Sequence, residues 1–268
     1  HAYTATGATD SKFGFPMISE LADKAIKAAM DAKNITLTGL HIHLGSPIFT
    51  VNPYQEGIDI VMQFASQMNA KYGFDLQEIS PGGGFASRYT EQQEPPSISE
   101  YAEAIVSSIH NSSKKYSIPE PHLMLEPGRS IINQAGVALY KIGGNKTIPG
   151  VRQYVFVDGG MADNIRPALY EAEYTAMVAN KMTDPLTDQV TIAGKYCESG
   201  DVLIKESNLP SLQPEDILAI PGSGAYCLPM ASNYNGALKP PIVVIKDKKP
   251  KLVRRRENYD DLMSHDID

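Results

Sequence analysis

Two histidines and a serine follow an early apolar segment and could bind a metal ion or a flat cofactor. His41 and His43 lie two positions apart in Gly-Leu-His-Ile-His-Leu-Gly-Ser (residues 39–46), so in a strand both side chains share one face. They could be zinc ligands, hydrogen-bonded structural histidines, or rings packed on a cofactor with Ser46 near its phosphate. The sequence favours the cofactor, because no third zinc ligand is obvious nearby.

Three consecutive glycines, Gly82, Gly83 and Gly84, follow a second apolar segment. Without Cβ atoms, their backbone N–H groups can converge on an anion. A tight turn would use the same residues, so both interpretations stay open. The segment lacks the Lys-Ser/Thr ending of a P-loop, which argues against a nucleoside triphosphate.

A carboxylate and a guanidinium follow a third apolar segment, in Glu126, Pro127, Gly128 and Arg129. Such a turn can place both groups in one cavity, where the planar fork of Arg suits a phosphate. A surface ion pair is the alternative. Because functional groups gather at the carboxyl ends of strands in parallel α/β folds, the three clusters predict a single site.

Together the clusters match the chemical needs of pyridoxal 5'-phosphate. Its phosphate needs amide and hydroxyl donors, its pyridine nitrogen needs a carboxylate, and its ring face needs a flat partner. Glu126 would keep the nitrogen protonated and the ring electron-withdrawing. The sequence therefore predicts this cofactor and no metal.

The second half of the chain carries a cysteine next to an acidic residue, Cys197-Glu198, in Cys-Glu-Ser-Gly-Asp. The thiol could be a proton donor or nucleophile beside a carboxylate that recognises a cation, or simply a small core side chain. Arg166 and Tyr170 are four residues apart and share one face if helical. Tyr226 ends a glycine-rich turn.

Helical and strand-like segments alternate up to about residue 130, which predicts parallel βα units. Ser97 and Glu100 form a capping box that starts one helix. We expect helices over 17–33, from Asn52-Pro53 and from Ser97, and strands over 37–44, 76–80 and 122–126.

The remainder of the chain is rich in β-branched and aromatic runs broken by Gly, Pro and Asn, which predicts a mainly antiparallel β domain. We expect two domains, residues 1–130 and 131–268. A closed (β/α)8 barrel needs eight βα units. The first domain has three, so more of a barrel is expected upstream of His1. The expected strands are residues 136–142, 153–157, 189–193, 217–220 and 241–245.

Charge, hydropathy and cysteine content argue against several classes of binding partner and location. The 268 residues carry 24 Lys plus Arg against 31 Asp plus Glu, a formal charge of -7, which argues against a nucleic-acid partner. No apolar run approaches the roughly 20 residues of a bilayer-spanning helix, so no membrane partner is expected. Two cysteines are too few for a disulfide scaffold and favour a cytoplasmic location.

These motifs, in this order, resemble those of the diaminopimelate decarboxylases, a family of fold-type III pyridoxal phosphate enzymes. The resemblance runs from Thr6-Gly7 to Leu262 and implies a partial (β/α)8 TIM-type barrel followed by a mainly antiparallel β domain. It also implies a homodimer with shared active sites, and decarboxylation of meso-diaminopimelate to L-lysine and carbon dioxide, the last step of lysine biosynthesis. The motifs are His41-x-His-x-Gly-Ser46, Gly82-Gly-Gly84, Glu126-Pro-Gly-Arg129, Cys197-Glu-Ser-Gly-Asp201 and Gly224-Ala-Tyr226.

By this resemblance, His43 stacks on the cofactor ring and Glu126 pairs with the pyridine nitrogen. Cys197 protonates the substrate carbon in the partner subunit's site after carbon dioxide leaves. The residues that hold the phosphate are Ser46, Gly82, Gly83, Gly84, Arg129 and Tyr226, with Pro127 and Gly128 completing the cofactor-binding motif. The residues that contact substrate are Arg129, Arg166, Tyr170, Glu198 and Tyr226, with Glu198 reading the distal end.

One feature of the family is missing. Its members bind the cofactor through a lysine in an Ala-x-Lys context, and no lysine of this chain matches it. The amine is needed for covalent catalysis, so the chain is expected to be inactive alone. Two alternatives stay open: a decarboxylase of another basic amino acid (ornithine, arginine or lysine), or a non-catalytic regulatory homologue.

Overall fold

The computed structural model describes residues 10–267, so Thr6 and Gly7, where the resemblance begins, lie outside the described residues. The described chain forms two compact units. Residues 10–87 and 94–131 make up the first, and residues 88–93 and 132–267 the second. Each unit has its own cluster of buried apolar side chains.

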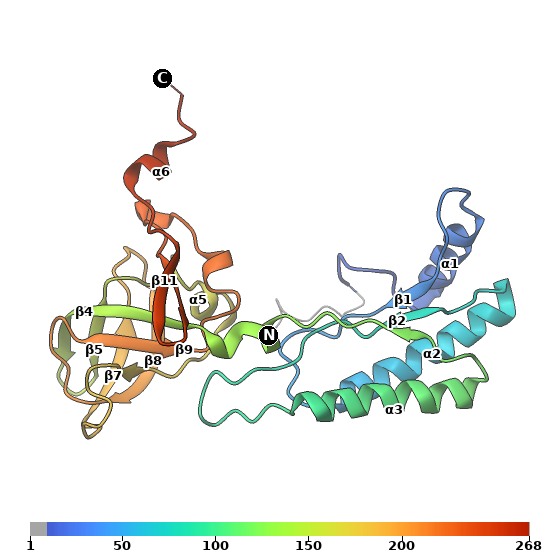
Figure 1. Ribbon diagram of the computed structural model, residues 1–268, viewed down its shortest axis with the longest axis horizontal. Coiled ribbons are helices and arrows are strands. Elements are labelled where there is room, and N and C mark those ends of the chain that lie inside the picture. The colour runs from blue at the N-terminus through green and yellow to red at the C-terminus, as the bar shows by residue number, and fades with distance from the viewer. Residues whose placement is uncertain (1–9, 268) are drawn as a thin grey trace. The chain divides into compact units, whose positions relative to one another are not determined.

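The first unit is a parallel sheet of three short strands in the order β1-β2-β3. The long helices α2 and α3 run side by side along it (Figure 1). This arrangement agrees with the predicted parallel βα units. Its elements are η1 (Ile18–Glu20), α1 (Leu21–Asp31), β1 (Gly39–His41), α2 (Asn52–Tyr72), β2 (Glu78–Ser80), α3 (Ile98–Tyr116), β3 (His122–Leu123) and α4 (Arg129–Ile132).

Helices α2 and α3 begin where the sequence indicates. Pro53 lies at the start of α2, where its missing N–H has no helical partner, and Gly73 ends the helix with φ +75°. The capping box of α3 is confirmed, because Ser97 accepts from the N–H of Glu100 while the Glu100 carboxylate accepts from that of Ser97. Both helices bury apolar faces against the sheet.

The strands of this unit are shorter than predicted. The expected strand over 37–44 forms only at Gly39–His41, and that over 122–126 only at His122–Leu123. Beyond these points the chain turns to build loops, as at Gly45 and Gly82, which have positive φ. The predicted helix over 17–33 also begins later, since residues 18–20 form a 3-10 turn.

The second unit is built on a six-stranded sheet in the order β6-β9-β4-β5-β7-β8, with a separate hairpin of β10 and β11. Only β5 and β7 pair in parallel, so the sheet is mainly antiparallel. Strands β6, β8 and β11 were not predicted. The elements are η2 (Asn133–Ala135), β4 (Val137–Ile148), β5 (Arg152–Val157), α5 (Arg166–Tyr170), β6 (Met177–Val178), β7 (Asp188–Ala193), β8 (Val202–Leu209), β9 (Ile217–Pro221), η3 (Leu228–Met230), η4 (Tyr234–Gly236), β10 (Ile242–Lys246), β11 (Lys249–Arg254) and α6 (Tyr259–Met263).

None of the helices within residues 10–267 combines the length and the apolar character needed to cross a membrane.

Candidate active site

The three clusters predicted in the first unit meet beyond the carboxyl ends of β1, β2 and β3. Arg129 donates from Nε and Nη2 to the Ser46 hydroxyl over 3.1 and 2.9 Å. The N–H of Glu126 donates to the carbonyl of Gly82 over 3.2 Å. Residues from all three loops are therefore in direct contact within one unit.

The glycine triad is packed too closely for any side chain. A Cβ on Gly83 would lie 2.1 Å from the carbonyl oxygen of Glu126, and one on Gly84 would lie 2.3 Å from that of Gly45. Gly82 and Gly84 also have φ of +79° and +88°, a region that disfavours residues with a Cβ. The triad is thus a tight turn whose largely buried backbone lies directly against the loops after β1 and β3.

Two tyrosines that were not predicted as site residues project from α2 and α3 and form hydrogen bonds to the backbone of these loops. Tyr54 of α2 is fully buried and donates its hydroxyl to the carbonyl of Gly83 over 2.8 Å. Tyr101 of α3 donates to the carbonyl of Ile48 over 2.6 Å and accepts from the N–H of Ala86. Burial raises the pKa of both phenols, so both stay protonated donors. A tyrosine on an otherwise apolar helix face was the available signal.

Arg129 is only 7% exposed, which excludes the surface ion pair considered for it. A guanidinium buried beside a hydroxyl and a glycine turn has the composition of a phosphate site.

The two histidines of β1 and its following loop have different surroundings. His43 is half-buried, and its ring packs against the backbone of Gly82, where a Cβ would lie 2.8 Å from Nδ1. His41 is exposed, and its Nε2 lies 3.1 Å from the Glu126 carboxylate. This contact was not predicted. Within residues 10–267, no group of three His, Cys, Asp or Glu residues could hold a metal ion, so the zinc interpretation has no ligand set there.

The remaining predicted site residues belong to the second unit. Arg166 begins the short helix α5 and Tyr170 ends it, so the segment is helical, the condition under which the two residues share one face. Arg166 is 5% exposed, and its guanidinium lies 4.8 Å from the Tyr89 ring centre and 5.6 Å from that of Tyr174. It also donates to the Tyr174 hydroxyl. Tyr226 has φ +62° and a side chain that is 42% exposed.

Cys197 and Glu198 lie on an exposed turn, so Cys197 is not the core thiol considered as an alternative; Cys227 is the buried cysteine. Asp201, at the end of the same motif, is 3% exposed and braces the turn. Its carboxylate accepts from the N–H of Met161 over 2.7 Å and from that of Tyr196 over 2.8 Å. Burial raises the pKa of Asp201, against the lowering effect of these two hydrogen bonds.

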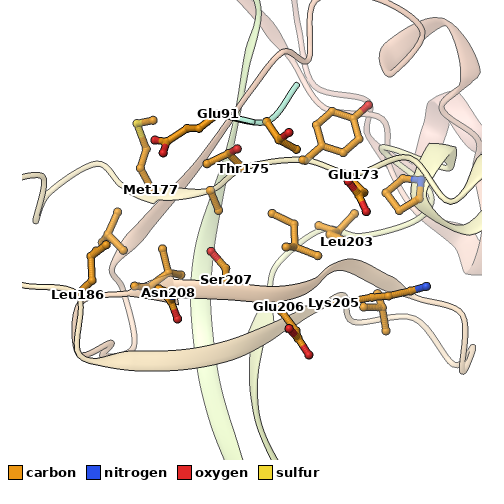
Figure 2. Close-up of a pocket in the computed structure, with 18 of the residues that line it drawn as sticks. Glu91, Glu173, Thr175, Met177, Leu186, Leu203, Lys205, Glu206, Ser207 and Asn208 are labelled. Carbon is orange, nitrogen blue, oxygen red and sulfur yellow. The ribbon is translucent and has the colours of Figure 1, made fainter. Parts of the chain in front are cut away.

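A cavity of about 900 Å³ also lies in the second unit, between β8 and the chain around residues 171–178 (Figure 2). Its walls are mixed, with Leu203, Glu206 and Asn208 on one side and Glu173, Thr175 and Met177 on the other. None of the predicted site residues lines it.

The comparisons with known proteins point to one family. The family described as "Pyridoxal-dependent decarboxylase, pyridoxal binding domain" matches residues 1–133. The diaminopimelate decarboxylase of Bacillus subtilis (strain 168) is 41% identical over 267 residues, 100% of this chain and 61% of that protein. That of Synechocystis sp. is 40% identical over 99% of this chain and 56% of its own length.

Solved structures agree. The diaminopimelate decarboxylase from M. jannaschii in complex with L-lysine matches with a TM-score of 0.91 and 35% identity, over 100% of this chain and 60% of that one. The lysine/ornithine decarboxylase of Vibrio vulnificus, complexed with putrescine, matches with a TM-score of 0.71 and 26% identity, over 85% of this chain and 59% of that one. The predicted fold class, a partial TIM-type barrel followed by a mainly antiparallel β domain, is confirmed. The chain spans about 60% of the length of the relatives it matches.

Proposed function

Since this chain belongs to the pyridoxal-dependent decarboxylase family, we propose that it forms part of a carboxy-lyase that converts meso-diaminopimelate to L-lysine and carbon dioxide. Residues 1–130 would be part of the pyridoxal phosphate-binding barrel and residues 131–268 its carboxyl-terminal β domain. The observation that carries the proposal is the buried Arg129 bonded to Ser46 beside a glycine turn, in a chain about 40% identical to diaminopimelate decarboxylases.

The residues present fit pyridoxal 5'-phosphate. Arg129 and Ser46 supply a guanidinium and a hydroxyl beside the backbone of residues 82–84, which is packed closely against the two neighbouring loops, and this combination suits a phosphate. We propose that Tyr226 completes this phosphate site and that Pro127 and Gly128 shape the turn. Glu126 would accept from the pyridine nitrogen, with His43 against the ring face.

When bound, the cofactor supplies an electron sink for the bond to the departing carboxylate. The residues of this chain would bind and orient the substrate and move one proton. Cys197 would donate its Sγ proton to the substrate carbon once carbon dioxide has left. The side chains proposed to contact substrate are Arg129, Arg166, Tyr170, Glu198 and Tyr226.

The role of Glu198 follows from its chemistry. Its exposed carboxylate accepts hydrogen bonds only, so it suits the ammonium group at the distal end of a diamino acid. Because Cys197 and Glu198 are exposed on their own unit, we propose that they complete the site of a second copy in a homodimer. Two free cysteines also agree with a cytoplasmic location.

The decisive assay uses this chain completed at its amino end with the corresponding segment of the Bacillus subtilis relative. We expect carbon dioxide release from meso-diaminopimelate, and none from ornithine, arginine or lysine. Release from one of those instead would support the alternative substrate. A completed chain that binds pyridoxal phosphate, judged by its absorbance, yet releases nothing from any of them would support a regulatory homologue.

A further inference from the structure

The carboxylate of Glu198 has a hydrogen-bond partner that the sequence motifs do not include. Tyr234, at the start of η4, donates its hydroxyl to Glu198 Oε2 over 3.2 Å. The two residues are 36 positions apart in the chain and both belong to the second unit. We propose that Tyr234 is a positioning residue that fixes the orientation of the Glu198 carboxylate and so sets the preference for substrates with a distal ammonium group.

The backbone around Tyr234 is anchored on both sides. Its N–H donates to the Ser232 hydroxyl over 3.3 Å, and its carbonyl accepts from the N–H of Ala237 over 3.1 Å. The Asn233 side chain donates to the carbonyl of Ala237 and to the Glu257 carboxylate, over 2.8 and 2.7 Å. The phenol therefore extends from a fixed turn.

The turn that carries Glu198 is anchored as well. The N–H of Glu198 donates to the carbonyl of Tyr196 over 2.8 Å, and its carbonyl accepts from the N–H of Asp201 over 3.0 Å. The buried Asp201 carboxylate fixes the base of this turn. What these contacts leave undetermined is the side chain of Glu198, which is exposed and has three rotatable bonds.

A phenol is well suited to remove that freedom. Tyrosine has a single rigid ring and one hydroxyl donor, so it restrains the carboxylate at little entropic cost of its own. One donated hydrogen bond leaves the carboxylate with acceptor sites for an incoming ammonium group. The negative charge of Glu198 is kept, and its position is defined before the substrate binds.

The contact is tested by the titration of Tyr234, since the hydrogen bond to Glu198 raises the pKa of this phenol. The chain labelled with ¹³Cζ-tyrosine is titrated by NMR, and the Tyr234 signal is assigned by its loss in Tyr234→Phe. We expect Glu198→Ala to lower the pKa of Tyr234 and the control Glu206→Ala to leave it unchanged. Equal Tyr234 titration curves in the parent, Glu198→Ala and Glu206→Ala proteins would overturn the proposal, independently of any activity measurement.

The second arm rests on the proposed function and uses the completed chain described above. We expect Tyr234→Phe to raise KM for meso-diaminopimelate roughly three- to tenfold, the effect of losing one hydrogen bond, with a smaller change in kcat. Tyr259→Phe is the matched control, because that side chain is 68% exposed and lies on α6. An active enzyme with unchanged KM in Tyr234→Phe would contradict the positioning role. No activity in the parent would contradict the proposed function and leave the titration result standing.

Discussion

Gly83 shows how closely the candidate site is packed at the level of single residues. The missing side chain lets the carbonyl of Glu126 approach to a point where a Cβ would be 2.1 Å away. Because that oxygen belongs to backbone, rotating a side chain cannot relieve the clash. The loops after β2 and β3 would have to separate.

Gly83→Ala is therefore expected to destabilise the chain by about 2–3 kcal/mol, in the upper range for overpacking a tight site. Urea unfolding measures the change. Gly144→Ala is the control, because a Cβ at Gly144 meets no atom within 4 Å. Equal stability of the two variants would show that the loops are not in contact as described.

Tyr54→Phe removes only the hydroxyl that donates to the carbonyl of Gly83. The buried carbonyl loses this donor, so we expect a loss of about 1–3 kcal/mol in the free energy of unfolding. The same substitution at the exposed Tyr259 should cost less than about 0.5 kcal/mol. A Tyr54→Phe protein as stable as the parent would remove Tyr54 as a support of the triad.

For single residues, the sequence predicted the motifs but not the side chains that form hydrogen bonds to them. That the loops with the glycines, Ser46 and Arg129 lie together could be predicted, because each follows a strand of the parallel sheet. The His41–Glu126 and Tyr54–Gly83 contacts join residues 85 and 29 positions apart. Such pairs depend on how distant segments pack, which a single sequence does not encode locally.

The turn from Tyr196 to Asp201 is the element that carries Cys197 and Glu198, the residues proposed to donate a proton to the substrate and to bind its distal end. The Asp201 side chain is buried, and this burial raises the pKa of its carboxyl group above the ordinary value of 3.8. The folded state therefore binds this proton more tightly than the unfolded state. Its contribution to stability is fully present below pH 3.8 and is lost as pH rises through the raised folded value.

The Asp201→Asn variant has no titratable group at this position, so comparing it with the parent isolates the pH-dependent contribution of the Asp201 carboxyl group to stability. The difference in unfolding free energy, parent minus variant, should fall as pH rises from 3.8 upward and then level off. Urea unfolding at a series of pH values measures it. A difference that is constant, or that grows with pH, would show that the carboxyl is not desolvated in this turn.

Helices were predicted better than strands, for physical reasons. Pro53 and the Ser97 capping box mark helix starts through local chemistry. Strand β8 contains the polar run Lys205-Glu206-Ser207, which hides its alternation, and it lies at an edge of the sheet. The strands of the first unit were predicted too long because apolar residues continue into the loops that form the site.

Residues 10–267 contain two separate clusters of buried apolar side chains, one in each unit. Ile58 lies in that of the first unit and Ile192 in that of the second, and both side chains are fully buried. Each unit thus has a core of its own.

Ile58→Ala and Ile192→Ala should each destabilise the unit that contains the residue, by about 2–5 kcal/mol. Amide hydrogen exchange resolves the effect along the chain. We expect Ile58→Ala to lower protection in residues 94–131 and to leave β4, β5 and β7 protected, and Ile192→Ala to do the reverse. Loss of protection throughout the chain in either variant would mean that the two clusters unfold as one.

We infer that the loops after β1, β2 and β3 form a single site for a pyridine phosphate. An amide NMR titration of the chain with pyridoxamine 5'-phosphate tests this inference, because this ligand has no aldehyde to react with surface lysines. Inorganic phosphate and pyridoxamine are titrated in parallel. We expect chemical-shift changes concentrated at residues 43–46, 82–84 and 126–129, with inorganic phosphate alone reproducing those at Ser46 and the glycines. No saturable shifts, or shifts confined to other parts of the chain, would contradict it.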